Sequence, residues 1–330
     1  MEQHWGINLR RRNFLKLAAS AGASWATSPI RAAAPVPPIP IIDAHIHLFD
    51  PSRPGGVPWP EPSDTVIYKP ALPDRYENIA APLGIVGAIA VEASPLLSDN
   101  DWVLQAAARN PIIVGVVGDL IPGAPNYAKD LERLHANPLF VGIRCGNLWK
   151  RDLGLDSKNP EFISGLKLLS GYGLEMDSAN PDNDLIRAIV EVSDRIPELR
   201  IVIDHLPSAP IPPPGAARKE YWSRLRHCAS NPNIFIKLSE IPVKVGQDVP
   251  KDPAYYRERL DVIWDLFGEN HILYGSDWPN SDHLATYADT LALVRGYVMQ
   301  KGNAACQKFF WKNSIAAYKW RPRRATQENL

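Results

Sequence analysis

Cysteine is scarce in this chain of 330 residues, which has only Cys145, Cys228 and Cys306. Three cysteines cannot form an even set of disulfides, and their spacings are not those of a zinc ribbon. The chain also lacks an excess of charge, because 36 Lys and Arg balance 36 Asp and Glu. This balance argues against nucleic-acid binding and against a basic membrane-surface protein. No apolar run reaches the ~20 residues of a transmembrane helix, so no stable membrane anchor is expected.

Proline, in contrast, is abundant, with 32 residues of 330, or about twice the usual share of ~5%. The prolines cluster in a few segments, which indicates stiffened loops and not a low-complexity chain. An apolar fraction of 45% and a charged fraction of 22% are typical of globular proteins. These values exclude disorder or a coiled coil as the main state.

The N-terminal segment has the pattern of an export signal. The pair Arg11-Arg12 precedes a weakly apolar stretch over residues 17–30, which ends in the small residues Ala32–Ala34. This order resembles a twin-arginine signal, and a basic amphipathic tail is the alternative. We expect residues 1–34 to be removed.

The resemblance implies export of the folded protein by the twin-arginine translocation machinery, to the periplasm or the medium. After the signal, residues 35–40 form a proline-rich lead. The sequence leaves open whether copies of the chain associate into a homo-oligomer.

Eight short runs rich in β-branched residues follow, separated by segments with helical periodicity. We expect strands over residues 41–49, 87–94, 112–120, 140–146, 173–178, 200–207, 234–241 and 272–279. We expect helices over residues 74–81, 99–109, 127–136, 160–170, 182–195, 216–230, 254–267, 283–300 and 303–318. Such alternation predicts a parallel sheet, and eight units predict a single-domain (β/α)₈ TIM barrel over residues 41–318. Residues 319–330 are left as a C-terminal tail.

Long loops follow the first, sixth and seventh expected strands, over residues 50–84, 208–215 and 242–253. Because each follows a strand, all three lie at the C-terminal rim of the barrel, where barrel enzymes carry their active sites. We therefore expect these loops to form the walls of a site.

Polar residues occur at the ends of strands that should be nearly all apolar. The first strand carries His45 and His47 in alternation with Asp43, the sixth ends in His205, and the eighth ends in Asp277. Packing alone does not require imidazoles and a carboxylate at one mouth. We also expect two inward cations, Arg144 on the fourth strand and Lys237 on the seventh.

Five segments, IIDAHIHLFD, VGIRCG, IVIDHLP, IFIKLSE and ILYGSDWP, occur in this order along the barrel. Together they resemble the amidohydrolase superfamily, and more narrowly its amidohydrolase-related (amidohydrolase 2) branch. That branch includes lactonases of sugar acids and of 2-pyrone-4,6-dicarboxylate, and it is related to metal-dependent decarboxylases. The resemblance implies a hydrolase, and a lactonase in particular.

The sequence departs from the metal-binding pattern of the superfamily. Two-metal members take a carboxylated Lys or a Glu from strand four and a His from strand five, whereas this chain offers Arg144 and no histidine there. The departure argues against a two-metal site. It leaves open either no essential metal or one divalent ion, Zn²⁺ or Mn²⁺, held by His45, His47 and Asp277 with His205.

Lactone hydrolysis assigns a role to each of these groups. Asp277 is the candidate base for the attacking water, and the imidazoles of His45, His47 and His205 are candidate donors to the developing oxyanion. Arg144 has the fork geometry to bind a substrate carboxylate. Further substrate contacts are expected from Lys237, Trp59, Trp278 and His283, although Lys237 has an ion pair with Glu92 as its alternative.

Other mechanisms lack their motifs. No G-x-S-x-G nucleophile elbow, dinucleotide fingerprint or phosphate-binding loop occurs, and Cys145 is expected to face away from the mouth. The expected function is hydrolysis of the lactone of a carboxylated or polyhydroxylated small molecule. The alternatives are a metal-dependent non-oxidative decarboxylase on the same scaffold and a catalytically silent periplasmic binding protein.

Replacing Arg11 and Arg12 together by lysine should block export, because the twin-arginine machinery reads the arginine pair. The measurement is the fraction of mature protein in the periplasm relative to the unchanged chain. Undiminished export of the lysine variant would show that this route is wrong.

Overall fold

The eight apolar runs form eight parallel strands in the computed structural model, which describes residues 38–328 and residue 330. The strands are β1 (Ile41–His47), β2 (Ile85–Val91), β3 (Ile113–Gly118), β4 (Phe140–Gly146), β5 (Glu175–Ala179), β6 (Arg200–Ile203), β7 (Ile234–Leu238) and β8 (Ile272–Tyr274). Each strand pairs with the next along the chain, in the order β1 to β8. The signal expected over residues 1–34 lies outside the described residues.

The sheet closes into a barrel between β1 and the residues that follow β8. The amide of Asp277 donates to the carbonyl of His45 at 2.9 Å, and the amide of His47 donates to the carbonyl of Trp278 at 2.7 Å. The (β/α)₈ barrel expected from the sequence is thereby confirmed. Closure also brings the ends of the first and last strands together, which places His45 and His47 beside Asp277.

Strands β6 and β8 are shorter than expected, ending at Ile203 and Tyr274. The polar residues His205 and Asp277 therefore lie just beyond the strands. Both have a positive φ, 51° and 60°, a left-handed conformation that cannot continue a strand. The change of backbone direction turns the side chains of these residues toward the barrel mouth.

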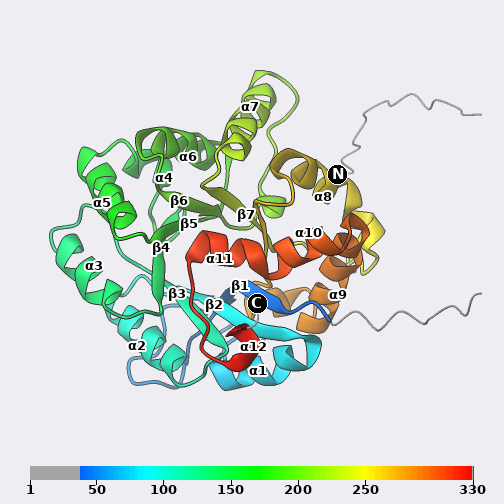
Figure 1. Ribbon diagram of the computed structural model, residues 1–330, viewed down its shortest axis with the longest axis horizontal. Coiled ribbons are helices and arrows are strands. Elements are labelled where there is room, and N and C mark those ends of the chain that lie inside the picture. The colour runs from blue at the N-terminus through cyan, green and yellow to red at the C-terminus, as the bar shows by residue number, and fades with distance from the viewer. Residues whose placement is uncertain (1–37, 329) are drawn as a thin grey trace, which may run out of the picture. The chain divides into compact units, whose positions relative to one another are not determined.

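Helices surround the barrel (Figure 1), and their buried faces are apolar. They are α1 (Pro73–Ala80), α2 (Leu97–Ala108), α3 (Tyr127–His135), α4 (Leu153–Asp156), α5 (Pro160–Gly171), α6 (Asn183–Arg195), α7 (Ala216–Ser230), α8 (Pro253–Phe267), α9 (Tyr287–Val298), α10 (Asn303–Gln307), α11 (Asn313–Tyr318) and α12 (Ala325–Glu328). In α6, for example, Asp182 caps the N-terminus by accepting from the amide of Leu185, and Ile186 and Ile189 are buried three residues apart.

Two expected helices differ from the structure. The helix expected over 283–300 begins only at Tyr287, after a 3₁₀ turn over Asn280–His283. The helix expected over 303–318 is interrupted by a π-helical turn over Lys308–Lys312. Among the described residues, no helix combines the length and the apolarity needed to cross a bilayer.

The C-terminal residues pack on the barrel. Arg323 donates to the carbonyls of Ala107 at 2.8 Å and Ile113 at 2.6 Å, and the amide of Gln327 donates to the carbonyl of Val86 at 2.8 Å. Val86 and Ile113 lie at the N-terminal ends of β2 and β3. The C-terminal segment therefore covers the N-terminal end of the barrel, opposite the candidate site. Helix α11 lies in front of the strands in Figure 1, which views the barrel from this end.

Candidate active site

Left-handed backbone at the strand ends marks the C-terminal mouth of the barrel. Trp149, Asn180, His205, Glu240 and Asp277 follow strands β4 to β8, one after each, and their φ angles lie between 50° and 60°. Non-glycine residues rarely adopt this conformation, and such strain gathers at functional sites. All five residues line one pocket.

This pocket has a volume of about 290 Å³, which is enough for a small molecule. It is lined by His47, Trp59, Ala93, Arg144, Leu148, Trp149, Ala179, Asn180, His205, Glu240, Asp277 and Asn280. The structure thus brings together five of the residues proposed from sequence, His47, Trp59, Arg144, His205 and Asp277. His45 is fully buried, and its Nε2 lies 3.3 Å from Nε2 of His47.

Hydrogen bonding fixes how His47 faces Asp277. Nδ1 of His47 lies 3.1 Å from the carbonyl oxygen of Val91, so Nδ1 carries the proton of a neutral ring. Its Nε2 is then an acceptor, and it lies 3.2 Å from Oδ1 of Asp277. Two acceptors at this distance require a positive charge between or upon them, either a proton on His47 or a metal cation.

The donor atoms at this point fit one metal ion. Nε2 of His45 lies 3.3 Å from Nε2 of His47 and 3.6 Å from Oδ1 of Asp277. Tetrahedral bonds of ~2.0–2.1 Å place ligand atoms ~3.3 Å apart, so these separations match the edges of a zinc coordination tetrahedron. Nε2 of His205, 4.0 Å from the same carboxylate oxygen, is near enough to be a fourth ligand or to bind a water.

Asp277 is ionised in this setting. Burial raises the pKa of its carboxyl, but the neighbouring His205 and the hydrogen bond with His47 outweigh burial and lower the pKa well below its usual range. Oδ2 of Asp277 also accepts from the amide of Asn280 at 2.7 Å. Asp277 is only 1% exposed, so its carboxylate contacts other protein groups on most sides.

Asp43 faces away from the pocket. The register of β1 shifts between Asp43 and Ile46, so the simple alternation with His45 and His47 fails. Its Oδ2 accepts from the hydroxyls of Tyr76 at 3.0 Å and Tyr287 at 2.9 Å. These tyrosines lie on α1 and α9, so Asp43 contacts the helical layer.

Lys237 lies beneath the pocket, with no exposed surface. Its Nζ is 2.5 Å from Oδ2 of Asp177, 2.8 Å from Oδ1 of Asp204 and 3.1 Å from Nδ1 of His45. Burial lowers the pKa of Lys237, but the two carboxylates outweigh burial and raise it. Neither a substrate contact nor the pairing with Glu92 expected from sequence is found, because Lys237 is enclosed by Asp177 and Asp204.

Arg144 is the cation that pairs with Glu92. Its Nε donates to Oε1 of Glu92 at 2.7 Å, and its Nη2 donates to the Glu92 carbonyl at 3.0 Å. The indole of Trp149 donates to Oε2 of the same carboxylate at 3.0 Å. Glu92 therefore holds two pocket-lining side chains in place and balances the charge of Arg144.

Trp278 and His283 lie outside the pocket, contrary to the roles expected from sequence. Trp278 is fully buried, and its ring packs 5.4 Å from that of Tyr76, because the backbone turn at Asp277 directs it toward α1. His283 pairs with Asp64 of the loop after β1, at 2.9 Å. It joins two rim loops to each other and does not line the pocket.

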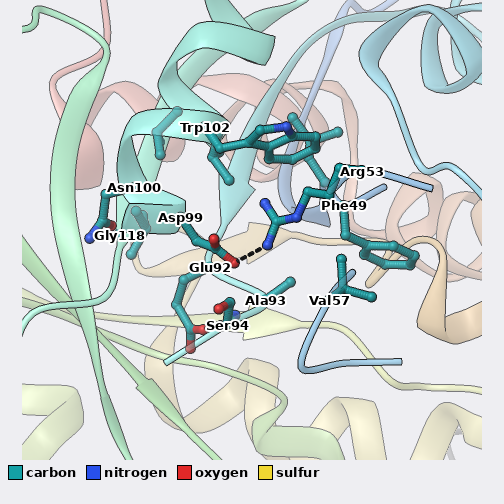
Figure 2. A pocket seen from close by; sticks show the side chains of 14 residues that line it. Phe49, Arg53, Val57, Glu92, Ala93, Ser94, Asp99, Asn100, Trp102 and Gly118 are labelled. Atoms are coloured by element: carbon teal, nitrogen blue, oxygen red, sulfur yellow. Dashed lines mark hydrogen bonds and ion pairs between the residues drawn. The ribbon is translucent and has the colours of Figure 1, made fainter. Parts of the chain in front are cut away.

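Trp59 forms the pocket wall from the long loop after β1. Its ring packs edge-on against His47, with 5.5 Å between centroids. Arg53 fixes this loop on α2 by an ion pair of 2.6 Å with Asp99 and by contact with the ring of Trp102 at 5.0 Å. Figure 2 shows Arg53, Asp99 and Trp102 beside a small cavity. The cavity has a volume of about 10 Å³, which has room for about one water.

Sequence reasoning missed several residues of the site. Asp204 pairs with Lys237 below the pocket, and Trp149, Asn180, Glu240 and Asn280 line the pocket itself. Their shared signal is that each lies within a few residues of a strand's C-terminal end. Cys145, in contrast, is buried and does not line the pocket, and burial raises the pKa of its thiol to about 12.

The comparisons with known proteins identify the family. The amidohydrolase family model matches residues 42–320, so the chain belongs to this family of hydrolases. Over 259 residues, it is 29% identical to an L-fucono-1,5-lactonase of Burkholderia ambifaria, covering 76% of this chain and 85% of that protein.

Solved structures show the same fold. An amidohydrolase from Burkholderia multivorans with bound zinc has a TM-score of 0.73 at 20% identity, covering 86% of this chain and all of that one. A probable 2-pyrone-4,6-dicarboxylic acid hydrolase from Acinetobacter baumannii has a TM-score of 0.66 at 16% identity, covering 84% of this chain and 99% of that one.

Replacing Lys237 by methionine should lower the free energy of unfolding by about 3–5 kcal/mol, because it leaves two buried carboxylates without their cation. Urea denaturation measures the change. Lys251→Met is the matched control, since Lys251 pairs with Asp289 on the surface and should cost under about 1 kcal/mol. Adding Asp177→Asn should recover part of the loss. Equal costs for Lys237→Met and the control would contradict the assignment.

Proposed function

We propose that the protein hydrolyses a lactone at the C-terminal mouth of its barrel, with Asp277 as the general base. The observation that carries this proposal is the ionised, buried Asp277 at the floor of a small-molecule pocket, within 4.0 Å of Nε2 of His45, His47 and His205. Support comes from the family and from the lactonase activity named for the Burkholderia ambifaria relative.

The reaction needs two kinds of group. A carboxylate must take a proton from water as the water oxygen attacks the carbonyl carbon. Positive or hydrogen-bonding groups must stabilise the oxyanion. The ring carbon–oxygen bond then breaks, and its oxygen takes up the proton. Asp277 supplies the first group, and Nε2 of His205, whose Nδ1 lies 2.8 Å from Oγ of Ser239, lies where it can supply the second.

His45, His47 and Asp277, with His205, would hold one divalent ion, as their donor-atom separations indicate. Such an ion supplies Lewis-acid polarisation of the carbonyl when it is bound. The related amidohydrolase solved with zinc supports this assignment. The protein's own part is to fix His47 through the Val91 carbonyl and to hold His45 above Lys237.

We further propose that the protein acts outside the cytoplasm. The twin-arginine pattern at Arg11-Arg12 and the apolar stretch after it support this location. Export in the folded state would suit a barrel whose three cysteines form no disulfide.

Asp277→Asn should lower kcat by about 10²–10⁴, the range for removal of a general base. Asparagine tolerates the positive φ at this position, so the fold should survive with a loss of about 1–3 kcal/mol from the altered buried hydrogen bonds. Steady-state kinetics and thermal melting measure the two effects. Asp282→Asn, a change at a nearby rim carboxylate outside the pocket, is the control and should retain kcat. A folded Asp277→Asn protein with normal turnover would remove Asp277 from the mechanism.

The activity itself is tested by incubating the protein with a panel of lactones. Hydrolysis is measured as the release of protons at constant pH. The purified protein should accelerate opening of at least one lactone above the spontaneous rate. Chelation followed by return of Zn²⁺ or Mn²⁺, with metal content measured in parallel, shows whether one ion per chain is bound and needed. Carbon dioxide release from an aromatic acid without lactone hydrolysis would instead identify a decarboxylase.

A further inference from the structure

Glu240 presents a carboxylate to the pocket that the mechanism does not use. It follows β7 with a φ of 50°, and its side chain is 34% exposed. Within the described part of the chain, this carboxylate accepts no hydrogen bond. Its nearest titratable partner is Nε2 of His205, at 4.0 Å, which is too long for one.

The rest of the pocket offers no unpaired positive side chain to balance Glu240. Arg144 is the only Lys or Arg among the described lining residues, and its charge is already paired with Glu92. Lys237 is enclosed by Asp177 and Asp204 below the pocket. Among the described lining residues, no free Lys or Arg would therefore offset the like charge that a substrate carboxylate meets beside Glu240.

The backbone at Glu240 shows that this placement is specific. A left-handed glutamate is costly, and an exposed loop residue with no contact would relax to an ordinary φ. Ser239, the preceding residue, is buried and its Oγ lies 2.8 Å from Nδ1 of His205. The turn thus places Ser239 against His205 beneath the pocket and aims the next side chain into it.

We propose that Glu240 determines substrate specificity by accepting hydrogen bonds from ring hydroxyls of a neutral, polyhydroxylated lactone and by repelling carboxylated lactones. The inference rests on the proposed lactonase activity and narrows its substrate. A carboxylate is acceptor-only and can receive two vicinal hydroxyl donors. The indoles of Trp59 and Trp149, which line the same pocket, offer apolar faces on which the ring carbons can pack.

Glu240→Gln tests this role, because it keeps the shape of the side chain and removes its charge. Three probes are compared, namely an aldonic acid 1,5-lactone, unsubstituted δ-valerolactone and 2-pyrone-4,6-dicarboxylate. For the hydroxylated lactone, kcat/KM should fall about 10- to 100-fold, the loss expected for hydrogen bonds to a charged group. For δ-valerolactone it should stay within about 2-fold, and for the dicarboxylate it should rise, as like-charge repulsion is removed.

Glu132→Gln is the matched control, because it removes the charge of an exposed glutamate on α3 that does not line the pocket. It should leave all three kcat/KM values unchanged. Metal content and melting temperature of Glu240→Gln are measured as well. They should equal those of the unchanged protein, because Glu240 is assigned to the substrate and not to a metal or the core.

The outcomes separate the two proposals. Loss confined to the hydroxylated lactone supports the role of Glu240. Equal loss on all three probes, lost metal, or a wild-type preference for the dicarboxylate overturns it while leaving lactone hydrolysis intact. No hydrolysis of any lactone by the unchanged protein overturns both.

Discussion

The buried ammonium of Lys237, held between Asp177 and Asp204, is the interaction on which the site depends. These residues come from β7, β5 and the end of β6, and Nζ of Lys237 also contacts His45 of β1. Burying such charges is costly unless each has a partner. The lysine balances the carboxylates, so the centre of the barrel can carry charge directly under the imidazoles of the candidate site without losing the fold.

This layer also sets the protonation of the groups above it. Burial raises the pKa of Asp204, but Lys237 outweighs burial and keeps it low, so Asp204 stays ionised. Asp177 differs, because burial and the nearby Asp204 raise its pKa to about 6 despite Lys237. Burial and the positive Lys237 lower the pKa of His45, which keeps that imidazole neutral and available as a donor or a ligand.

Periodicity predicted the fold, and residue type predicted the floor of the site. Eight apolar runs were enough for the barrel, and the histidines with Asp277 converge as expected because strand ends meet at one mouth. Pairings across the barrel could not be predicted, because they depend on register. One such pairing is that of Glu92, which forms its ion pair with Arg144 and not with Lys237. Trp278 was misplaced because left-handed backbone at Asp277 turns it outward, and periodicity carries no signal for such a turn.

The site thus has two layers with different physical constraints. The lower layer is Lys237 with Asp177 and Asp204, and the upper layer is formed by the residues that line the pocket. In the lower layer, charges compensate one another and water is excluded, so no substrate reaches Lys237 and a change there acts on stability. In the upper layer, the side chains follow the strands on left-handed turns, and the sequence pattern places Glu240 inside the strand expected over 234–241, whereas β7 ends at Leu238. Within the described residues, the carboxylate of Glu240 accepts no hydrogen bond from the protein, and Nε2 of His205 lies 4.0 Å from it. Under the two proposals, Glu240 in the upper layer selects the lactone that binds, and Asp277 with the imidazoles acts on that lactone.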